Sequence, residues 1–245
     1  MPFTIAHPAI VIPFTFLPKK WFSITGLILG SMLPDFEYFI RFQIKSTFSH
    51  TILGTFYFCL PLGLILAYVF HNYVKKRLIY NLPYIFQKKC SVLLSLNWNN
   101  YLKKNMLVVM YSLIIGSFTH LFWDGFTHHD GYFVTKIPQL CDVISINQFD
   151  FYAYKILQHL STLIGVIMLS IAFLLLPNIE INNSTQNRDY WLAIFFSTIL
   201  ILFIRWQFGL TINQYGNIIV SLISSFIIAL ILISIFFKKY YLNNK

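Results

Sequence analysis

Long apolar segments separated by short polar stretches are the dominant pattern of this chain of 245 residues. Five such segments occur, at residues 51–74, 106–123, 160–176, 190–206 and 217–237. Each has about 17 to 24 residues, and a helix that rises about 1.5 Å per residue crosses a hydrocarbon core of roughly 30 Å with that length. The pattern predicts an all-α fold, a polytopic transmembrane helical bundle with about five spans.

The region before these segments consists of two shorter apolar pieces. They lie within residues 5–33, on either side of Pro18, Lys19 and Lys20. Each piece has about 12 to 14 residues and is too short to span a bilayer alone, so an N-terminal re-entrant helical hairpin is predicted. The hairpin would return Asp35 to the membrane face of His7, whereas the alternative, a single kinked span, would separate them.

Composition excludes a soluble globular protein. Hydrophobic residues make up 57% of the chain and charged residues only 11%, less than half of the roughly one quarter usual in soluble domains. We expect a single integral membrane domain over residues 1–245. Because its last two spans carry no histidine, a site-bearing part at 1–176 is predicted to precede a two-span scaffold part at 177–245.

The net charge of +10 is explained by its distribution along the chain. Residues 75–104 contain seven Lys or Arg and no acidic residue, and Lys238, Lys239 and Lys245 follow the last span. In a five-span arrangement both regions lie on one side, which the positive-inside rule makes cytoplasmic. We therefore expect membrane lipid and no nucleic acid as partner, in an inner (cytoplasmic) membrane with the opposite face outward.

Histidine and aspartate residues gather on that outward face if the spans alternate in direction. His50 opens the first span, His120 and Asp124 end the second, His128 follows, and His159 opens the third. His120 and Asp124 are four residues apart, so on a helix their Cβ atoms lie about 5 to 6 Å apart and the pair can hold one ion. Nitrogen and carboxylate donors without thiolate suit Zn²⁺, Mn²⁺ or Fe²⁺. The simpler interpretation is that these residues only cap helices at the interface.

Four short motifs resemble one known family. They are MPFTIAHPA at 1–9, GSMLPDFEY at 30–38, SHT at 49–51 and HLFWD at 120–124. The sequence is similar, over most of its length, to a bacterial integral-membrane family catalogued as domain of unknown function 4184. That family in turn resembles proteins labelled membrane-bound metal-dependent hydrolases.

A more distant resemblance concerns the order of ligands in zinc-dependent phospholipases C and S1/P1-type nucleases. The residues that follow this order are His7, Asp35, His50, His120, Asp124, His128 and His159. By this resemblance Asp35, His50, His120 and Asp124 hold one metal, and Asp124 bridges to a second. Leu163 stands where those enzymes carry an acidic ligand. One metal site would therefore lack its carboxylate unless Asp130 or Asp150 supplies it. We expect one or two divalent ions, zinc above all, rather than three.

These patterns lead to the hypothesis of a membrane-embedded metal-dependent hydrolase. It would act at the outer face on phosphoester bonds of a lipid or lipid-linked substrate, with water activated by the metal. The expected catalytic residues are Asp124, as bridging ligand, and Glu37, which would orient the water or act as general base.

Two other hypotheses remain open. The first is a non-enzymatic protein that binds or transports metal. Transport would need ligands along the whole path through the bilayer. Only His71 is expected toward the inner face, which disfavours transport. Alternatively, the histidines would only stabilise packing. The three cysteines, Cys59, Cys90 and Cys141, have no CxxC spacing, so neither a thiolate metal site nor redox chemistry is predicted.

Overall fold

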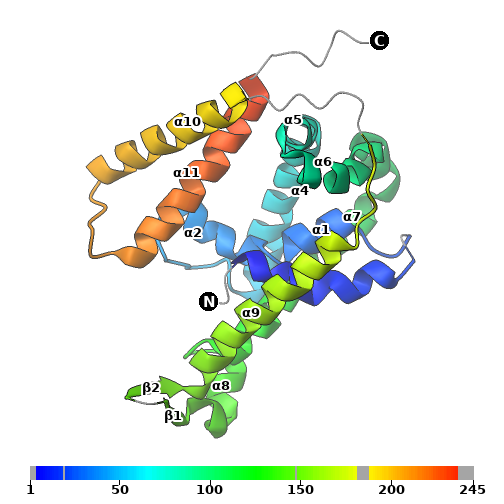
Figure 1. Ribbon diagram of the computed structural model, residues 1–245. Helices are drawn as coiled ribbons and strands as arrows, with labels where there is room; N and C mark the ends of the chain where they lie inside the picture. Colours follow the sequence, from blue (N-terminus) through cyan, green and yellow to red (C-terminus); the bar gives the residue numbers. More distant parts are fainter. Residues whose placement is uncertain (1–3, 19, 147, 181–187, 237–245) are drawn as a thin grey trace, which may run out of the picture. The chain divides into compact units, whose positions relative to one another are not determined.

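The computed structural model of the chain describes residues 4–18, 20–146, 148–180 and 188–236 (Figure 1). Within these residues the fold is helical apart from one two-stranded hairpin, which confirms the all-α prediction. Five helical stretches are long and apolar enough to cross a membrane, as expected of an integral membrane protein. They are Ile52–Asn81, Trp98–Thr127, Ala153–Leu174, Arg188–Gln207 and Tyr215–Phe236. The predicted number of spans is confirmed.

The first half of the chain contains the shorter elements and the first span. The elements before that span are η1 (Thr4–Phe16), α1 (Ile24–Gly30), η2 (Leu33–Asp35) and α2 (Phe36–Arg41). The first span is continuous but includes two π-helical turns, and its parts are α3 (Ile52–Gly54), η3 (Thr55–Cys59), α4 (Leu60–Val69), η4 (Phe70–Val74) and α5 (Lys75–Asn81). Two short helices follow, α6 (Tyr84–Cys90) and η5 (Ser91–Ser95).

The second half contains the other four spans. These are α7 (Trp98–Thr127), α9 (Ala153–Leu174), α10 (Arg188–Gln207) and α11 (Tyr215–Phe236). Between α7 and α9 lie α8 (Tyr132–Lys136), η6 (Pro138–Cys141), β1 (Val143–Ile146) and β2 (Phe149–Tyr152).

The chain divides into two compact units, neither of them continuous in sequence. The first comprises Met1–Phe36, Ser46–Ile65 and Leu102–Leu175. The second comprises Glu37–Lys45, Leu66–Tyr101 and Leu176–Lys245. Every metal-ligand candidate belongs to the first unit, and the prediction of a single membrane domain stays a prediction.

The N-terminal hairpin has the two short helical arms that the sequence predicts, η1 and α1, which pack on each other. The first arm is a 3₁₀-helix with Pro8 and Pro13 inside it. Each proline lacks a backbone N–H and clashes with the preceding turn of an α-helix, which explains the departure from α geometry. The same arm also lies along α9 (Figure 1), where a Cβ on Gly165 would be 3.0 Å from the Cβ of Ala6.

The second arm crosses α7 at very short distance, and this crossing positions the site. A Cβ on Gly116 would lie 2.8 Å from the Cα of Gly30 and 2.5 Å from the carbonyl oxygen of Leu27. Small residues permit such close helix contacts in membranes. Next to the crossing, the Ser117 hydroxyl lies within hydrogen-bond distance of two carbonyl oxygens, that of Leu113 at 3.0 Å and that of Gly30 at 3.2 Å. The end of α1 is thereby fixed against the turn of α7 that carries His120.

The first three spanning helices depart from the predicted segments by several residues at one end or both, whereas the bounds of α10 and α11 agree with the prediction to within two residues. The first span ends at Asn81 rather than at 74, and Lys75 within it is buried, with its Nζ donating to the Leu96 carbonyl oxygen at 2.9 Å. Residues 75–104 are largely helical, because they contain α5, α6, η5 and the start of α7. The second span begins at Trp98 and is kinked at Asn105, whose φ and ψ are −131° and 30°. Helical backbone hydrogen bonds continue into the polar residues beside the apolar segments, and a hydropathy pattern does not predict this continuation.

The sequence analysis missed the hairpin in the segment between α7 and α9. Strands β1 and β2 are antiparallel, and Val143 pairs with Tyr152. The signal was present, because two short runs rich in β-branched and aromatic residues flank a polar turn. Asp150, named as a possible replacement ligand, lies in β2 and accepts a hydrogen bond from the Ser145 hydroxyl at 2.6 Å.

Helices α10 and α11 pack together within the second unit. Tyr190, Ile194 and Ala229 form their buried core, and the hydroxyls of Tyr190 and Ser234 are 2.8 Å apart. The scaffold role of this pair remains a prediction, and Lys238, Lys239 and Lys245 lie outside the described residues.

Candidate metal centre

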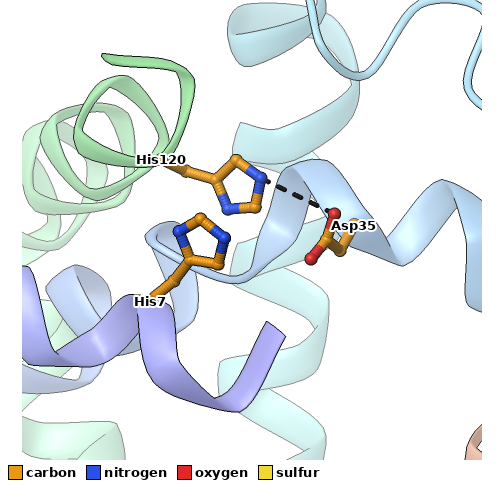
Figure 2. Close-up of side chains that lie close together, drawn as sticks. All are labelled: His7, Asp35 and His120. Atoms are coloured by element: carbon orange, nitrogen blue, oxygen red, sulfur yellow. Dashed lines mark ion pairs between the residues drawn. The ribbon is translucent and has the colours of Figure 1, made fainter. Parts of the chain in front are cut away.

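Six of the seven predicted ligands come together in the first unit. His7 comes from η1, Asp35 from η2 and His50 from the turn before α3. The end of α7 supplies His120 and Asp124, and His128 follows directly after it. Figure 2 shows three of them, with the rings of His7 and His120 side by side and Asp35 opposite His120. Four separate chain segments thus supply the cluster.

Two sets of three residues have ligand atoms within 4.8 Å of one another. One is His7, Asp35 and His120, and the other is His50, His120 and Asp124. His120 belongs to both and is fully buried. The cluster therefore centres on this imidazole.

The separations within the cluster match those of ligands around a metal. His50 Nε2 lies 3.4 Å from Asp35 Oδ1 and 3.7 Å from Asp124 Oδ2, and His120 Nε2 lies 3.6 Å and 3.2 Å from the same two oxygens. Two ligand atoms bound to one tetrahedral metal at about 2.0 to 2.2 Å lie roughly 3.3 to 3.6 Å apart. Most of these contacts are too long for hydrogen bonds but suit a shared cation.

The ring orientation of His120 is set by a hydrogen bond to the backbone. Its Nδ1 lies 2.8 Å from the carbonyl oxygen of Ser31, and because a carbonyl only accepts, Nδ1 carries the proton. In the neutral ring, Nε2 then presents its lone pair to the carboxylates of Asp35 and Asp124. That contact is repulsive unless a proton or a metal ion stands between them. A backbone carbonyl behind the far nitrogen is the usual partner of a metal-binding histidine.

His50 is oriented in a similar way by two serine hydroxyls. Its Nδ1 lies 3.0 Å from Ser46 Oγ and 3.1 Å from Ser49 Oγ. Ser49 donates its own hydroxyl proton to the Pro34 carbonyl oxygen at 2.7 Å, so it is left to accept from His50. When Nδ1 carries the ring proton, Nε2 of His50 faces the two carboxylates with its lone pair.

His7 stacks on His120, with ring centroids 3.8 Å apart and planes inclined by 17°. The side chain is buried, and neither ring nitrogen has a hydrogen-bond partner among the described residues. Its nearest charged neighbour is Asp124, with Nε2 3.7 Å from Oδ1. Burying polar atoms without partners is costly, and a metal ion would satisfy them.

Asp35 is fully buried, and a threonine hydroxyl fixes its carboxylate. Thr4 Oγ1 donates to Oδ2 at 2.6 Å, which leaves Oδ1 for the two imidazoles. Burial by itself would raise the pKa of the Asp35 carboxyl, but the positive charge of a protonated His120 and a hydrogen bond from His50 outweigh it and hold this pKa below its usual range. Asp35 is thus ionised at neutral pH, as a ligand must be.

Asp124 is in contact with four histidines. Oδ2 faces His50 and His120, whereas Oδ1 lies 3.7 Å from His7 Nε2 and 3.6 Å from His128 Nδ1. Neither oxygen has a hydrogen bond among the described residues. This division of the two oxygens suits a carboxylate that bridges two ions.

The two remaining ligand candidates are less central. His128 belongs to neither ligand set, and its Nδ1 donates to the Asp124 carbonyl oxygen at 3.1 Å. Burial lowers the pKa of the His128 imidazole. His159 is exposed on α9 and joins neither set, and the same holds for Asp130 and Asp150. The structure therefore does not bring His159 into the cluster.

Glu37, the candidate general base, belongs to the second unit. It is buried, and its Oε1 accepts from both Nε and Nη2 of Arg41 at 2.8 Å. Its catalytic role stays a prediction.

The sequence analysis did not identify the residues that orient the ligands. They are Thr4, Ser31, Ser46 and Ser49. For Ser46 and Ser49 a signal existed, since hydroxyl residues one and four positions before His50 can reach its ring. Ser31 acts through its backbone and left no such signal.

The fold and the site together define a helical integral membrane protein with a buried His/Asp cluster suited to a metal ion. The chain belongs to the family described as domain of unknown function DUF4184, whose profile matches residues 1–235. Comparison with curated proteins gave no match, and comparison with solved structures gave none either.

Proposed function

We propose that the protein is a membrane-embedded metal-dependent hydrolase that cleaves phosphoester bonds of a lipid or lipid-linked substrate. The observation that carries the proposal is the set of four contacts of 3.2 to 3.7 Å that His50 and His120 make with the two carboxylates. A cluster that served packing alone would be expected to close these gaps with hydrogen bonds.

Zinc is the proposed cofactor, as one or two ions. The first would be held by Asp35 Oδ1, His50, His120 and Asp124 Oδ2. The second would take Asp124 Oδ1 and His7, with His128 beside them. Because the nitrogen of His128 that lies near Asp124 Oδ1 is also the one that donates to a backbone carbonyl, the second position has fewer ready protein ligands. Catalytic zinc sites characteristically keep such an open position for water or substrate.

A divalent ion supplies Lewis acidity and lowers the pKa of water toward neutrality. The protein's own part is to hold the donors in place: Thr4 orients Asp35, the Ser31 carbonyl orients His120, and Ser46 and Ser49 orient His50. Glu37 is retained as the proposed group that accepts a proton from water.

Support for a phosphoester substrate comes from the resemblance in ligand order to zinc-dependent phospholipases C and S1/P1-type nucleases. A lipid substrate is supported by the five helices that are long and apolar enough to cross a membrane. Clustering of basic residues at 75–104 supports an inner-membrane location with the site facing outward.

The proposal is tested by purifying the full chain in a mild detergent without chelator and measuring zinc and hydrolysis of a chromogenic phosphodiester and a phospholipid. We expect one or two zinc ions per chain, and activity that a chelator removes and zinc restores. Asp124→Asn should lower zinc affinity by about tenfold or more, whereas Asp150→Asn, in the exposed hairpin, should not. Purified protein without metal would refute the proposal, and metal without hydrolysis would favour a metal-binding role.

A further inference from the structure

A largely apolar cavity of about 410 Å³ adjoins the metal centre in the first unit. Its walls come from η1, from α9 and from Trp123 at the end of α7. His7 is part of the wall, so one residue belongs both to the cluster and to the cavity. The volume lies in the range of about 300 to 1,000 Å³ typical of ligand sites.

The wall offers little to a polar ligand away from His7. Among the residues that line the cavity, Ser161 carries a hydroxyl, and its proton is donated to the Leu157 carbonyl oxygen at 2.5 Å. Most other wall residues are aliphatic, including Ala9, Ile164 and Met168. An apolar ligand is therefore favoured over a polar one.

Part of the wall is formed by exposed residues of α9, a helix that is long and apolar enough to cross a membrane. Leu160, Ile164 and Met168 of α9 keep 49%, 54% and 39% of their surface exposed. A hydrocarbon chain would reach the cavity from the bilayer without crossing water. His7, in the same wall, is only 4% exposed.

We infer that this cavity binds one hydrocarbon chain of a membrane lipid, with the polar end of the lipid toward His7 and Asp124. As a statement about the substrate, the inference rests on the proposed hydrolase function. Chain binding itself depends only on the cavity. The site thus selects a lipid by its chain as well as by the bond to be cleaved.

The test uses Trp123 as reporter and a lysophospholipid with a dibrominated acyl chain as probe, because bromine quenches indole fluorescence on contact. The full chain in mild detergent is titrated with this probe. We expect saturable quenching that disappears in Trp123→Phe. Quenching that rises without saturation, or that is unchanged in Trp123→Phe, would overturn the inference.

Ser161→Phe provides the second arm, since a ring at this position fills the cavity. It should weaken the apparent affinity for the probe by about tenfold or more. Ser170→Phe is the matched control, because Ser170 is exposed on the same helix and also donates to the carbonyl four residues earlier, at 2.8 Å. Ala9→Leu adds volume to the wall formed by η1 and serves if Ser161→Phe does not fold. Wild-type affinity in the folded cavity variant would contradict the inference.

The two proposals fail separately. The titration is repeated after chelation, where the inference expects the same saturable quenching. Saturable, Ser161-dependent quenching in a protein without metal or hydrolysis would keep the cavity inference and refute the hydrolase. Zinc-dependent hydrolysis of a soluble diester without saturable quenching would keep the hydrolase proposal and refute the cavity inference.

Discussion

His120 donates a hydrogen bond from Nδ1 to the backbone carbonyl oxygen of Ser31 at a distance of 2.8 Å. This contact joins the end of α7 to the turn after α1, and both partners are fully buried. It fixes which nitrogen of His120 faces the carboxylates of Asp35 and Asp124. The geometry of the metal centre therefore depends on how closely α1 and α7 approach each other.

Gly116→Ala tests this dependence. Its new Cβ would lie 2.5 to 2.8 Å from backbone atoms of Leu27, Ser31 and Gly30, none of which moves easily. We expect a loss of about 1 to 3 kcal/mol in stability, as for other overpacked cores, together with loss of bound zinc. Alanine is the better helix former, so any loss must come from the crossing.

The control for the glycine test is Gly216→Ala in the second unit. There a Cβ meets the end of the flexible Ile44 side chain, which can move aside. Thermal unfolding in detergent and zinc analysis of both variants check the prediction. Unchanged stability and metal content in Gly116→Ala would show that the crossing does not hold the site.

Thr4→Val tests the orientation of Asp35. Valine keeps the shape of threonine but removes the hydroxyl that donates to Asp35 Oδ2 at 2.6 Å. Loss of such an outer partner typically costs about 10- to 100-fold in metal affinity, and we expect a reduction of this size in a zinc titration against a competing chelator. Thr15→Val is the matched control on the same arm, since Thr15 is exposed and donates only to the Ile12 carbonyl oxygen. Equal zinc affinity of the two variants would contradict the proposed role of Thr4.

Most of the cluster could be predicted from the sequence, because span length determines which membrane face each helix end reaches. His50 and His120 stand at ends of different spans and meet for this reason. The same argument placed His159 with them, yet His159 is exposed on α9. Rotation of a helix about its axis decides that outcome. The buried side of α9 carries Tyr154, Gln158 and Gly165, spaced four and seven residues apart, and His159 lies on another side. An argument from span ends alone does not use this periodicity.

The contacts that orient the ligands were harder to predict. The Ser31 carbonyl reaches His120 only because Gly30 and Gly116 let two helices touch, which is a tertiary property. Thr4 and Asp35 are 31 residues apart and meet through the hairpin formed by η1 and α1. Local patterns predict elements and their ends, whereas these contacts follow from packing.

Glu37→Gln separates a catalytic role from a structural one. The carboxylate is buried and accepts from Arg41 within α2, so its neutralisation should cost about 1.5 to 3 kcal/mol of stability. If Glu37 also accepts a proton from water, the variant loses hydrolysis while keeping its zinc. Arg41→Gln breaks the same ion pair and keeps the carboxylate. We therefore expect both variants to unfold at lower temperature and only Glu37→Gln to lose activity. Equal activity in the two folded variants would restrict Glu37 to a structural role.

The native cysteines test the orientation of the protein in the membrane. Cys141 is exposed in the segment between α7 and α9, whereas Cys90 is half-buried at the end of α6, within the basic stretch. In a Cys59→Ala background, each is retained alone by changing the other to serine. The lysine distribution predicts that a membrane-impermeant maleimide labels Cys141 in intact cells, and Cys90 only after permeabilisation. Labelling of Cys90 but not Cys141 in intact cells would reverse the orientation and place the metal centre on the cytoplasmic side.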